Sequence, residues 1–194
     1  TDGRWNVAAG ESTPYKTRIV VRRPIAPERF RGTVLVEWLN VSGGLDASPD
    51  WVFMHTELIR RGYAWVGVSA QYVGVEGGPG LVSVISLPLK AVNPARYGSL
   101  HHPGDSFSYD IFSQVAQSIR RPYGQRPLSE LAVTHVIAAG ESQSAFRLVT
   151  YVNAIQPLSR AFDGFILAIY FGTGSPLEVG DTVVNINAAP TIRS

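Results

Sequence analysis

The stretch VIAAGESQSAFRLV, residues 136–149, joins an apolar run typical of a buried strand to a segment with helical periodicity. Ser142 stands where the first pattern gives way to the second. A sharp strand-to-helix turn requires small residues two positions before and two positions after its central serine, because the strand and the helix pass close together there. Gly140 and Ser144 meet this requirement, although the last position more often carries Gly. The pattern therefore predicts a nucleophile elbow with Ser142 at its tip.

The helix that starts after Ser142 leaves its first backbone N–H groups without intrahelical partners. The Gln143 N–H would then lie beside the serine oxygen and could bind a developing oxyanion. The alternative interpretation is that Ser142 only caps this helix.

Strand-like and helix-like segments alternate along the rest of the chain. The predicted strands are 17–24, 33–40, 63–70, 134–140 and 162–170, with a weak candidate at 182–187. The predicted helices are 51–62, one capped by Asp105 or Ser106 and reaching Arg120, and 142–155 stopped by Pro157. This alternation predicts the α/β class, with a mostly parallel sheet and flanking helices.

A second oxyanion donor is expected from the loop after an earlier strand, and the Asn40–Gly44 loop has that place. Ser42, Gly43 and Gly44 would let the backbone turn its N–H groups towards the elbow. Taken alone, this loop could also be a glycine-rich turn leading into the next helix. Glu141, which precedes the serine, is interpreted as a structural carboxylate that bonds loop N–H groups, and it is also a candidate pocket residue, with a catalytic role as the alternative.

Composition excludes several classes of protein. The 194 residues suit one domain, and the absence of cysteine excludes disulfides, thiolate nucleophiles and cysteine-based zinc sites. A formal net charge of +2 gives no indication of nucleic acid binding, and the scattered arginines are interpreted as surface and ion-pair residues. No apolar run is long enough for a membrane span, and neither the compartment nor the oligomeric state is indicated. The stretch GVEGGPG, 74–80, lacks the spacing of nucleotide-binding loops.

Four longer strings resemble the α/β-hydrolase domain family of bacterial serine hydrolases. They are GTVLVEWLNVSGGLDASPDW (32–51), GYAWVGVSAQYVGVEG (62–77), RYGSLHHPGDSFSYDIFSQ (96–114) and VIAAGESQSAFRLVTYVNA (136–154). The resemblance implies an α/β-hydrolase fold, Ser142 as nucleophile and no cofactor, but it implies no particular substrate. Carboxylic ester chemistry is the default for a serine elbow, so we expect a small-molecule ester or other acyl substrate and no metal. A non-catalytic binding domain of the same fold remains the alternative.

The histidines do not follow the order of this fold, in which the acid and then the histidine come after the serine. All four histidines precede Ser142, and only Asp163, Glu178 and Asp181 follow it as acids. We therefore expect residues 1–194 to be an incomplete α/β-hydrolase domain that lacks its C-terminal strands, its acid and its histidine, with strand 162–170 at an open edge. His101 and His102, in the long 71–104 loop, are candidate pocket residues that could approach Ser142.

Overall fold

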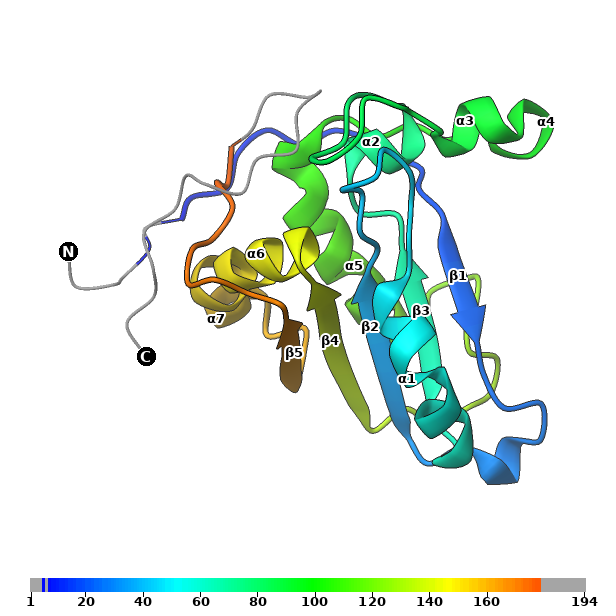
Figure 1. The fold of residues 1–194 in the computed structure, drawn as a ribbon. Helices are drawn as coiled ribbons and strands as arrows, with labels where there is room; N and C mark the ends of the chain where they lie inside the picture. The colour runs from blue at the N-terminus through cyan, green and yellow to red at the C-terminus, as the bar shows by residue number, and fades with distance from the viewer. Residues whose placement is uncertain (1–4, 6, 179–194) are drawn as a thin grey trace.

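The computed structural model describes residues 5 and 7–178, which form one sheet with helices on both faces (Figure 1). The strands of this part of the chain are β1 (Ile19–Arg22), β2 (Thr33–Trp38), β3 (Ala64–Val68), β4 (His135–Glu141) and β5 (Gly164–Ala168). They lie in the order β1-β3-β2-β4-β5. All neighbours are parallel except β1, which runs antiparallel to β3. The predicted mostly parallel sheet is confirmed.

The helical segments between the strands vary widely in length. They are η1 (Pro27–Arg29), α1 (Pro49–Arg60), α2 (Tyr72–Val75), α3 (Leu89–Val92), α4 (Pro94–Tyr97), η2 (Asp105–Phe107), α5 (Ser108–Arg120), α6 (Gln143–Thr150), η3 (Tyr151–Ile155) and α7 (Gln156–Ser159). Within the described residues, no helix is both long and apolar enough to cross a bilayer.

One face of the sheet is covered by α5 and α6. Val36 and Trp38 of β2 share a buried cluster with Phe112 of α5 and Leu148 of α6. The rings of Trp38 and Phe112 lie 4.8 Å apart between centroids. Burying each large apolar side chain stabilises the fold by about 1.5–3 kcal/mol. This cluster therefore fixes the helix that follows Ser142 against the sheet.

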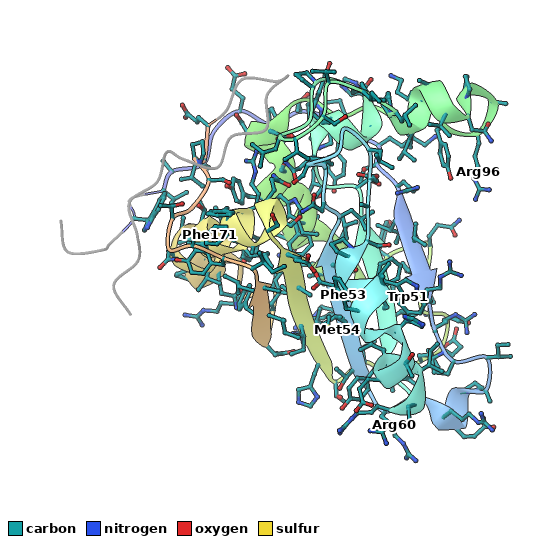
Figure 2. All side chains as sticks on the ribbon, viewed as in Figure 1. Trp51, Phe53, Met54, Arg60, Arg96 and Phe171 are labelled. Carbon is teal, nitrogen blue, oxygen red and sulfur yellow. The ribbon has the colours of Figure 1, made fainter. Side chains whose placement is uncertain are left out.

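The opposite face is covered by α1. Leu35, which alternates with Val36 along β2, packs with Leu58 and with the partly buried Trp51 and Met54 of α1. Figure 2 shows Trp51 and Met54 on this helix, together with Phe53, which is largely exposed. Since residues of a strand point alternately to its two faces, the consecutive apolar side chains Val34, Leu35 and Val36 of β2 require cover on each side.

The strand order reverses direction at β2. The chain runs from β2 through α1 to β3 on one side, and later returns to β4 on the other side. In open α/β sheets, ligands bind beside the carboxyl ends of the strands at such a reversal. The loops after β2 and β4 therefore flank the expected crevice, and these loops hold Asn40 and Ser142.

Two predicted helix boundaries were wrong. Neither Asp105 nor Ser106 caps a helix, because the N-cap residues of η2 and α5 are Gly104 and Phe107. Pro157 does not stop the helix after Ser142. The helix widens into the π-helical η3, and Pro157 then lies in the first turn of α7, where its missing N–H costs least.

The predicted strand 162–170 is confirmed as β5, shorter at both ends. Among the described residues it pairs only with β4 and is partly buried. The long loop 71–104 contains three one-turn helices, α2, α3 and α4. The weak strand candidate at 182–187 lies outside the described residues.

Candidate functional site

Ser142 lies between β4 and α6 with φ 54° and ψ −119°, which confirms the predicted strand-to-helix tip and its unusual backbone. These angles match the first central position of a type II′ turn, which favours glycine. The Ser142 N–H donates to the Ala168 carbonyl at 2.9 Å, and the Phe146 N–H donates to the Ser142 carbonyl at 3.2 Å. The strained residue is thus held on one side by β5 and on the other by α6.

Gly140 and Ser144 pack against each other, as the steric argument requires. A Cβ placed on Gly140 would lie 3.0 Å from the Ser144 carbonyl carbon, 3.1 Å from its Cβ and 3.0 Å from Leu148 Cδ1. The first of these neighbours is backbone and cannot move away cheaply. A side chain at position 140 would therefore separate the strand from the helix and displace Ser142.

The first turn of α6 presents free polar groups beside the serine. No backbone hydrogen bond in the described part of the chain uses the Gln143 N–H. The side chains of Gln143 and Ser144 are completely buried, and the Gln143 amide and the Ser144 hydroxyl have no hydrogen-bond partner. The Gln143 N–H therefore has no acceptor in the described chain, a condition that an oxyanion donor must meet.

Asn40 joins the loop after β2 to the elbow. Its Nδ2 donates to the Glu141 carbonyl at 2.8 Å, and its Oδ1 accepts the Ser42 N–H at 2.8 Å. The parallel register pairs Glu37 of β2 with Ala139 of β4, three residues before Asn40 and Ser142 respectively. The Asn40–Gly44 loop thus starts beside Ser142, as predicted.

Two of the predicted oxyanion donors already have acceptors. The Ser42 N–H is used by Asn40, and the Gly44 N–H donates to the Val41 carbonyl at 3.0 Å. Within the described residues, the N–H groups of Val41 and Gly43 have no acceptor. Gly44, with φ 76°, is required for another reason, because a Cβ there would lie 2.0 Å from the Ile85 carbonyl oxygen.

His102 is buried, and both of its ring nitrogens have backbone partners. Its Nε2 lies 2.8 Å from the Ala70 carbonyl oxygen, and its Nδ1 accepts the Gly104 N–H at 3.2 Å. This arrangement fixes the tautomer with the proton on Nε2. Burial lowers the pKa of His102, so the ring is neutral near pH 7. It holds the 71–104 loop to the end of β3, and it is not bonded to Ser142.

Within the described residues, the other three histidines also form no hydrogen bond to Ser142. His101 is exposed, and its backbone forms a bridge with Lys16. The Nδ1 of His55 lies 3.0 Å from the Val52 carbonyl oxygen within α1. His135 begins β4, at the opposite end of that strand from the elbow.

The carboxylate that bonds backbone N–H groups near the elbow is Glu37 and not Glu141, and these N–H groups belong to the first turn of α1 rather than to a loop. The Glu37 carboxylate accepts the N–H groups of Asp50 at 3.0 Å and Trp51 at 2.9 Å, and the Trp65 Nε1–H at 2.8 Å. Burial, followed by the neighbouring Asp50 carboxylate, raises the pKa of Glu37 to about 7. The sequence signal was a glutamate inside the apolar strand TVLVEW.

Asp50 is a second buried acid near the elbow. Its Oδ2 has no hydrogen-bond partner. Burial, followed by the Glu141 carboxylate, raises the pKa of Asp50 to about 7. Glu141 therefore influences Asp50 through its charge, while its own carboxylate accepts no hydrogen bond from the described residues.

A buried ion pair that was not predicted from the sequence joins α6 to η2. Arg147 Nη2 lies 2.7 Å from Asp105 Oδ2, and both side chains are almost completely buried. The same carboxylate accepts the Tyr72 N–H at 2.7 Å and the Gln71 Nε2–H at 3.2 Å. The scattered arginines were predicted to be surface and ion-pair residues; Arg147 forms an ion pair but is buried, and it joins α6 to the segment after β3.

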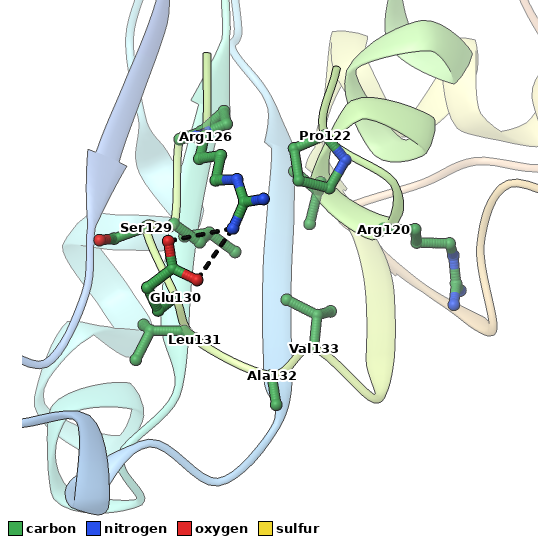
Figure 3. Close-up of a pocket in the computed structure, with 11 residues that line it drawn as sticks. Arg120, Pro122, Arg126, Ser129, Glu130, Leu131, Ala132 and Val133 are labelled. Atoms are coloured by element: carbon green, nitrogen blue, oxygen red, sulfur yellow. Dashed lines mark hydrogen bonds and ion pairs between the residues drawn. The ribbon is translucent and has the colours of Figure 1, made fainter. Parts of the chain in front are cut away.

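Two pockets of the described chain lie away from Ser142. Figure 3 shows one between α5 and the start of β4, where Arg126 and Glu130 form an ion pair at 2.8 Å. A second is lined by Trp5 and by residues of η3 and α7. Neither holds an elbow residue. No three His, Asp or Glu side chains of the described residues gather as a metal-binding group.

Comparison with known proteins gives one family. No curated protein matches the chain. A family model described as alpha/beta hydrolase domain matches residues 1–194, and its fold agrees with the mostly parallel sheet and its flanking helices. The chain therefore belongs to the alpha/beta hydrolase domain family.

Proposed function

We propose that the protein is a serine hydrolase that cleaves carboxylic esters of small molecules, with Ser142 as the nucleophile. Family membership supports hydrolase function in general. The observation that carries the finer proposal is the positive-φ serine between β4 and α6, with the Asn40 side chain bonded beside it. A structural cap alone would not need a strained serine conformation.

In the proposed reaction, Ser142 Oγ bonds to the acyl carbon of the ester while its proton passes to a base. The Gln143 N–H, together with a donor from the Asn40–Gly44 loop, stabilises the negative charge on the carbonyl oxygen. Val41 and Gly43 provide the loop N–H groups that are without acceptors in the described chain. Collapse of the intermediate expels the alcohol, which takes the proton, and water then releases the acid.

None of the four histidines is proposed as the base, because the His102 ring nitrogens are bonded to backbone and the other three form no hydrogen bond to Ser142 in the described chain. A serine without a base is a weak nucleophile. We therefore expect residues 1–194 alone to hydrolyse esters at a negligible rate.

The test is labelling of the intact protein with a fluorophosphonate, followed by peptide mapping. We expect the label on Ser142 and its loss in Ser142→Ala, with both proteins unfolding at the same temperature. Ser118→Ala on α5, whose hydroxyl only contacts the Val115 carbonyl, is the matched control and should label normally. A label on another serine would move the nucleophile elsewhere.

The second candidate is a binding domain that keeps the elbow as scaffold. It is favoured by one observation, that no hydrogen bond in the described chain joins Ser142 to a histidine. An intact protein that binds esters, takes no label at any serine and releases no acid would establish this alternative.

A further inference from the structure

The segment 77–88, between α2 and α3, exposes an unusual number of aliphatic side chains. It contains no charged residue. Val82 is 79% exposed and Val84 94% exposed. The other exposed aliphatic residues of the segment are Leu81, Ile85 and Leu87. Single exposed apolar residues are common on protein surfaces, but five within seven positions mark a binding surface.

This segment is fastened by its backbone to the loop after β2. The Val82 N–H donates to the Ser42 carbonyl at 3.0 Å, and the Leu87 N–H donates to the Gly44 carbonyl at 2.9 Å. Gly80 also passes so close that a Cβ there would lie 2.3 Å from the Ser42 carbonyl oxygen. Because the backbone groups face the loop, the aliphatic side chains are left on the outside.

The ends of the segment are fixed as well. Lys90 Nζ pairs with Glu76 Oε2 at 2.6 Å, and the Gly78 N–H donates to Ser86 Oγ at 3.0 Å. The ion pair joins the residues that flank the two ends of the segment, and the charges of Lys90 and Glu76 neutralise each other. The segment is therefore held in place beside the Asn40–Gly44 loop, and its backbone lies at the carboxyl ends of the parallel strands (Figure 1).

Given the function proposed above, we propose that residues 81–87 bind the acyl chain of the substrate, and that the substrates are esters of apolar acids with chains of several carbons. The loop that carries this surface is the one whose Asn40 bonds the carbonyl next to Ser142. An ester held at Ser142 and at the loop N–H groups has its acyl chain directed to the rim of that loop. Aliphatic side chains without charge suit an alkyl chain and disfavour a charged or strongly polar acid.

Other occupants fit this surface less well. Each side chain offers about 60–120 Å² of apolar area, so five offer at most roughly 600 Å², below the about 800 Å² per partner of a stable dimer. A peptide strand would need free backbone groups, and those of Val82 and Leu87 are in use. An anionic membrane would need free cations, and Lys90 is paired with Glu76.

The test uses ethyl-, butyl- and octylboronic acid, which mimic acyl groups of increasing length and add reversibly to a nucleophilic serine. Each buried methylene should tighten binding by roughly fourfold. We expect octylboronic acid to bind the intact protein at least about tenfold more tightly than butylboronic acid. Ser142→Ala should remove the boron adduct, seen by boron NMR.

The decisive variant is Val82→Ser combined with Val84→Ser, two exposed positions whose change leaves the core intact. We expect it to weaken octylboronic acid roughly tenfold and to leave ethylboronic acid unchanged. The matched control is Ile25→Ser, because Ile25 is 96% exposed but precedes η1 at the other end of the sheet. It should change neither affinity.

The outcomes separate this inference from the proposed function. If boronic acids add to Ser142 but their affinity does not depend on chain length, the proposal for the acyl-chain surface is wrong and the nucleophile is still supported. The same holds if the affinity depends on chain length equally in the wild-type protein and in the double variant. Octyl binding that the double variant weakens, without any adduct at Ser142, supports the surface and removes the esterase. Wild-type protein that dimerises or sediments with phosphatidylcholine vesicles through Val82 and Val84, without binding the octyl probe, also overturns it.

Discussion

Ser142 occupies a backbone conformation that glycine adopts at no steric cost and serine adopts only under constraint. The hydrogen bonds to Ala168 and Phe146 supply that constraint, so the surrounding structure determines the angle. Strain of this kind amounts to about 1–3 kcal/mol and is kept where the side chain has a role. The protein is thus expected to be less stable with serine at position 142 than with glycine.

Ser142→Gly should therefore raise the free energy of unfolding by about 1 kcal/mol relative to Ser142→Ala, since alanine keeps the strain and glycine removes it. Urea unfolding followed by fluorescence measures the difference. Ser118→Gly, inside α5, is the control and should destabilise by about 0.5–1 kcal/mol. Equal stability of the two Ser142 variants would show that the turn relaxes without cost.

Asn40→Ala should destabilise the protein by about 1–3 kcal/mol and abolish fluorophosphonate labelling of Ser142. The change leaves the Glu141 carbonyl and the Ser42 N–H without their partner, and unpartnered buried groups carry that cost. Asn93→Ala, which removes the exposed bond to the Arg96 N–H, should cost about 1 kcal/mol and leave labelling intact. Labelling that survives Asn40→Ala would show that the Asn40–Gly44 loop is not needed for the reaction of Ser142.

At the scale of elements, the junction of β4 with α6 determines the site, and its spacing depends on the absence of a side chain at position 140. Gly140→Ala should cost about 1–3 kcal/mol and slow labelling of Ser142, because the new methyl meets the Ser144 backbone at 3.0 Å. Thermal unfolding and labelling rate are the two measurements. Gly10→Ala, where a Cβ meets nothing within 4 Å, should change neither.

Those parts of the site that depend on residues close together in the sequence could be predicted. The elbow was predictable because small residues, an apolar strand and a helix start all lie within positions 136–149. The Asn40 contact to Glu141 spans 101 residues, and no local pattern reports such a pair. The buried pair of Arg147 and Asp105 was not predicted for the same reason. The sequence around an arginine does not show whether its guanidinium is buried by distant parts of the chain.

The position of a loop histidine along the chain does not determine which groups its ring contacts. The sequence placed His102 at the correct end of the sheet. The Ala70 carbonyl and the Gly104 N–H nevertheless take both ring nitrogens. Buried backbone groups need partners, and a nearby imidazole that meets this need is removed from catalysis.

For the whole molecule, the two raised carboxyl groups make stability depend on pH. The pKa values of Glu37 and Asp50 are about 7 in the folded state, above the ordinary values near about 4 of an unfolded chain. The folded state then binds more protons than the unfolded state between those values. The contribution of these groups is fully present below about pH 4 and is lost as the pH rises through 7.

Asp50→Asn should therefore stabilise the protein at pH 8 and flatten the fall in stability between pH 5 and 8. The amide keeps the shape of the side chain and removes the charge that burial and Glu141 disfavour. Urea unfolding at several pH values measures the slope. Asp110→Asn, at an exposed position of α5, should leave the slope unchanged, and the same slope in both variants would contradict the assignment.

The central strand β2 completes its pairing only after a long delay during synthesis. β2 can pair with β3 soon after both are made. Its other neighbour, β4, is made much later, because the Thr134–Gly32 hydrogen bond at the start of this pairing joins residues 102 positions apart. A ribosome adds about 5–20 residues per second, so one edge of β2 waits about 5–20 s for its partner. During that interval an apolar strand edge is open to other nascent chains. Slower translation should therefore favour aggregates over folded protein, and chaperones that cover strand edges should raise the yield.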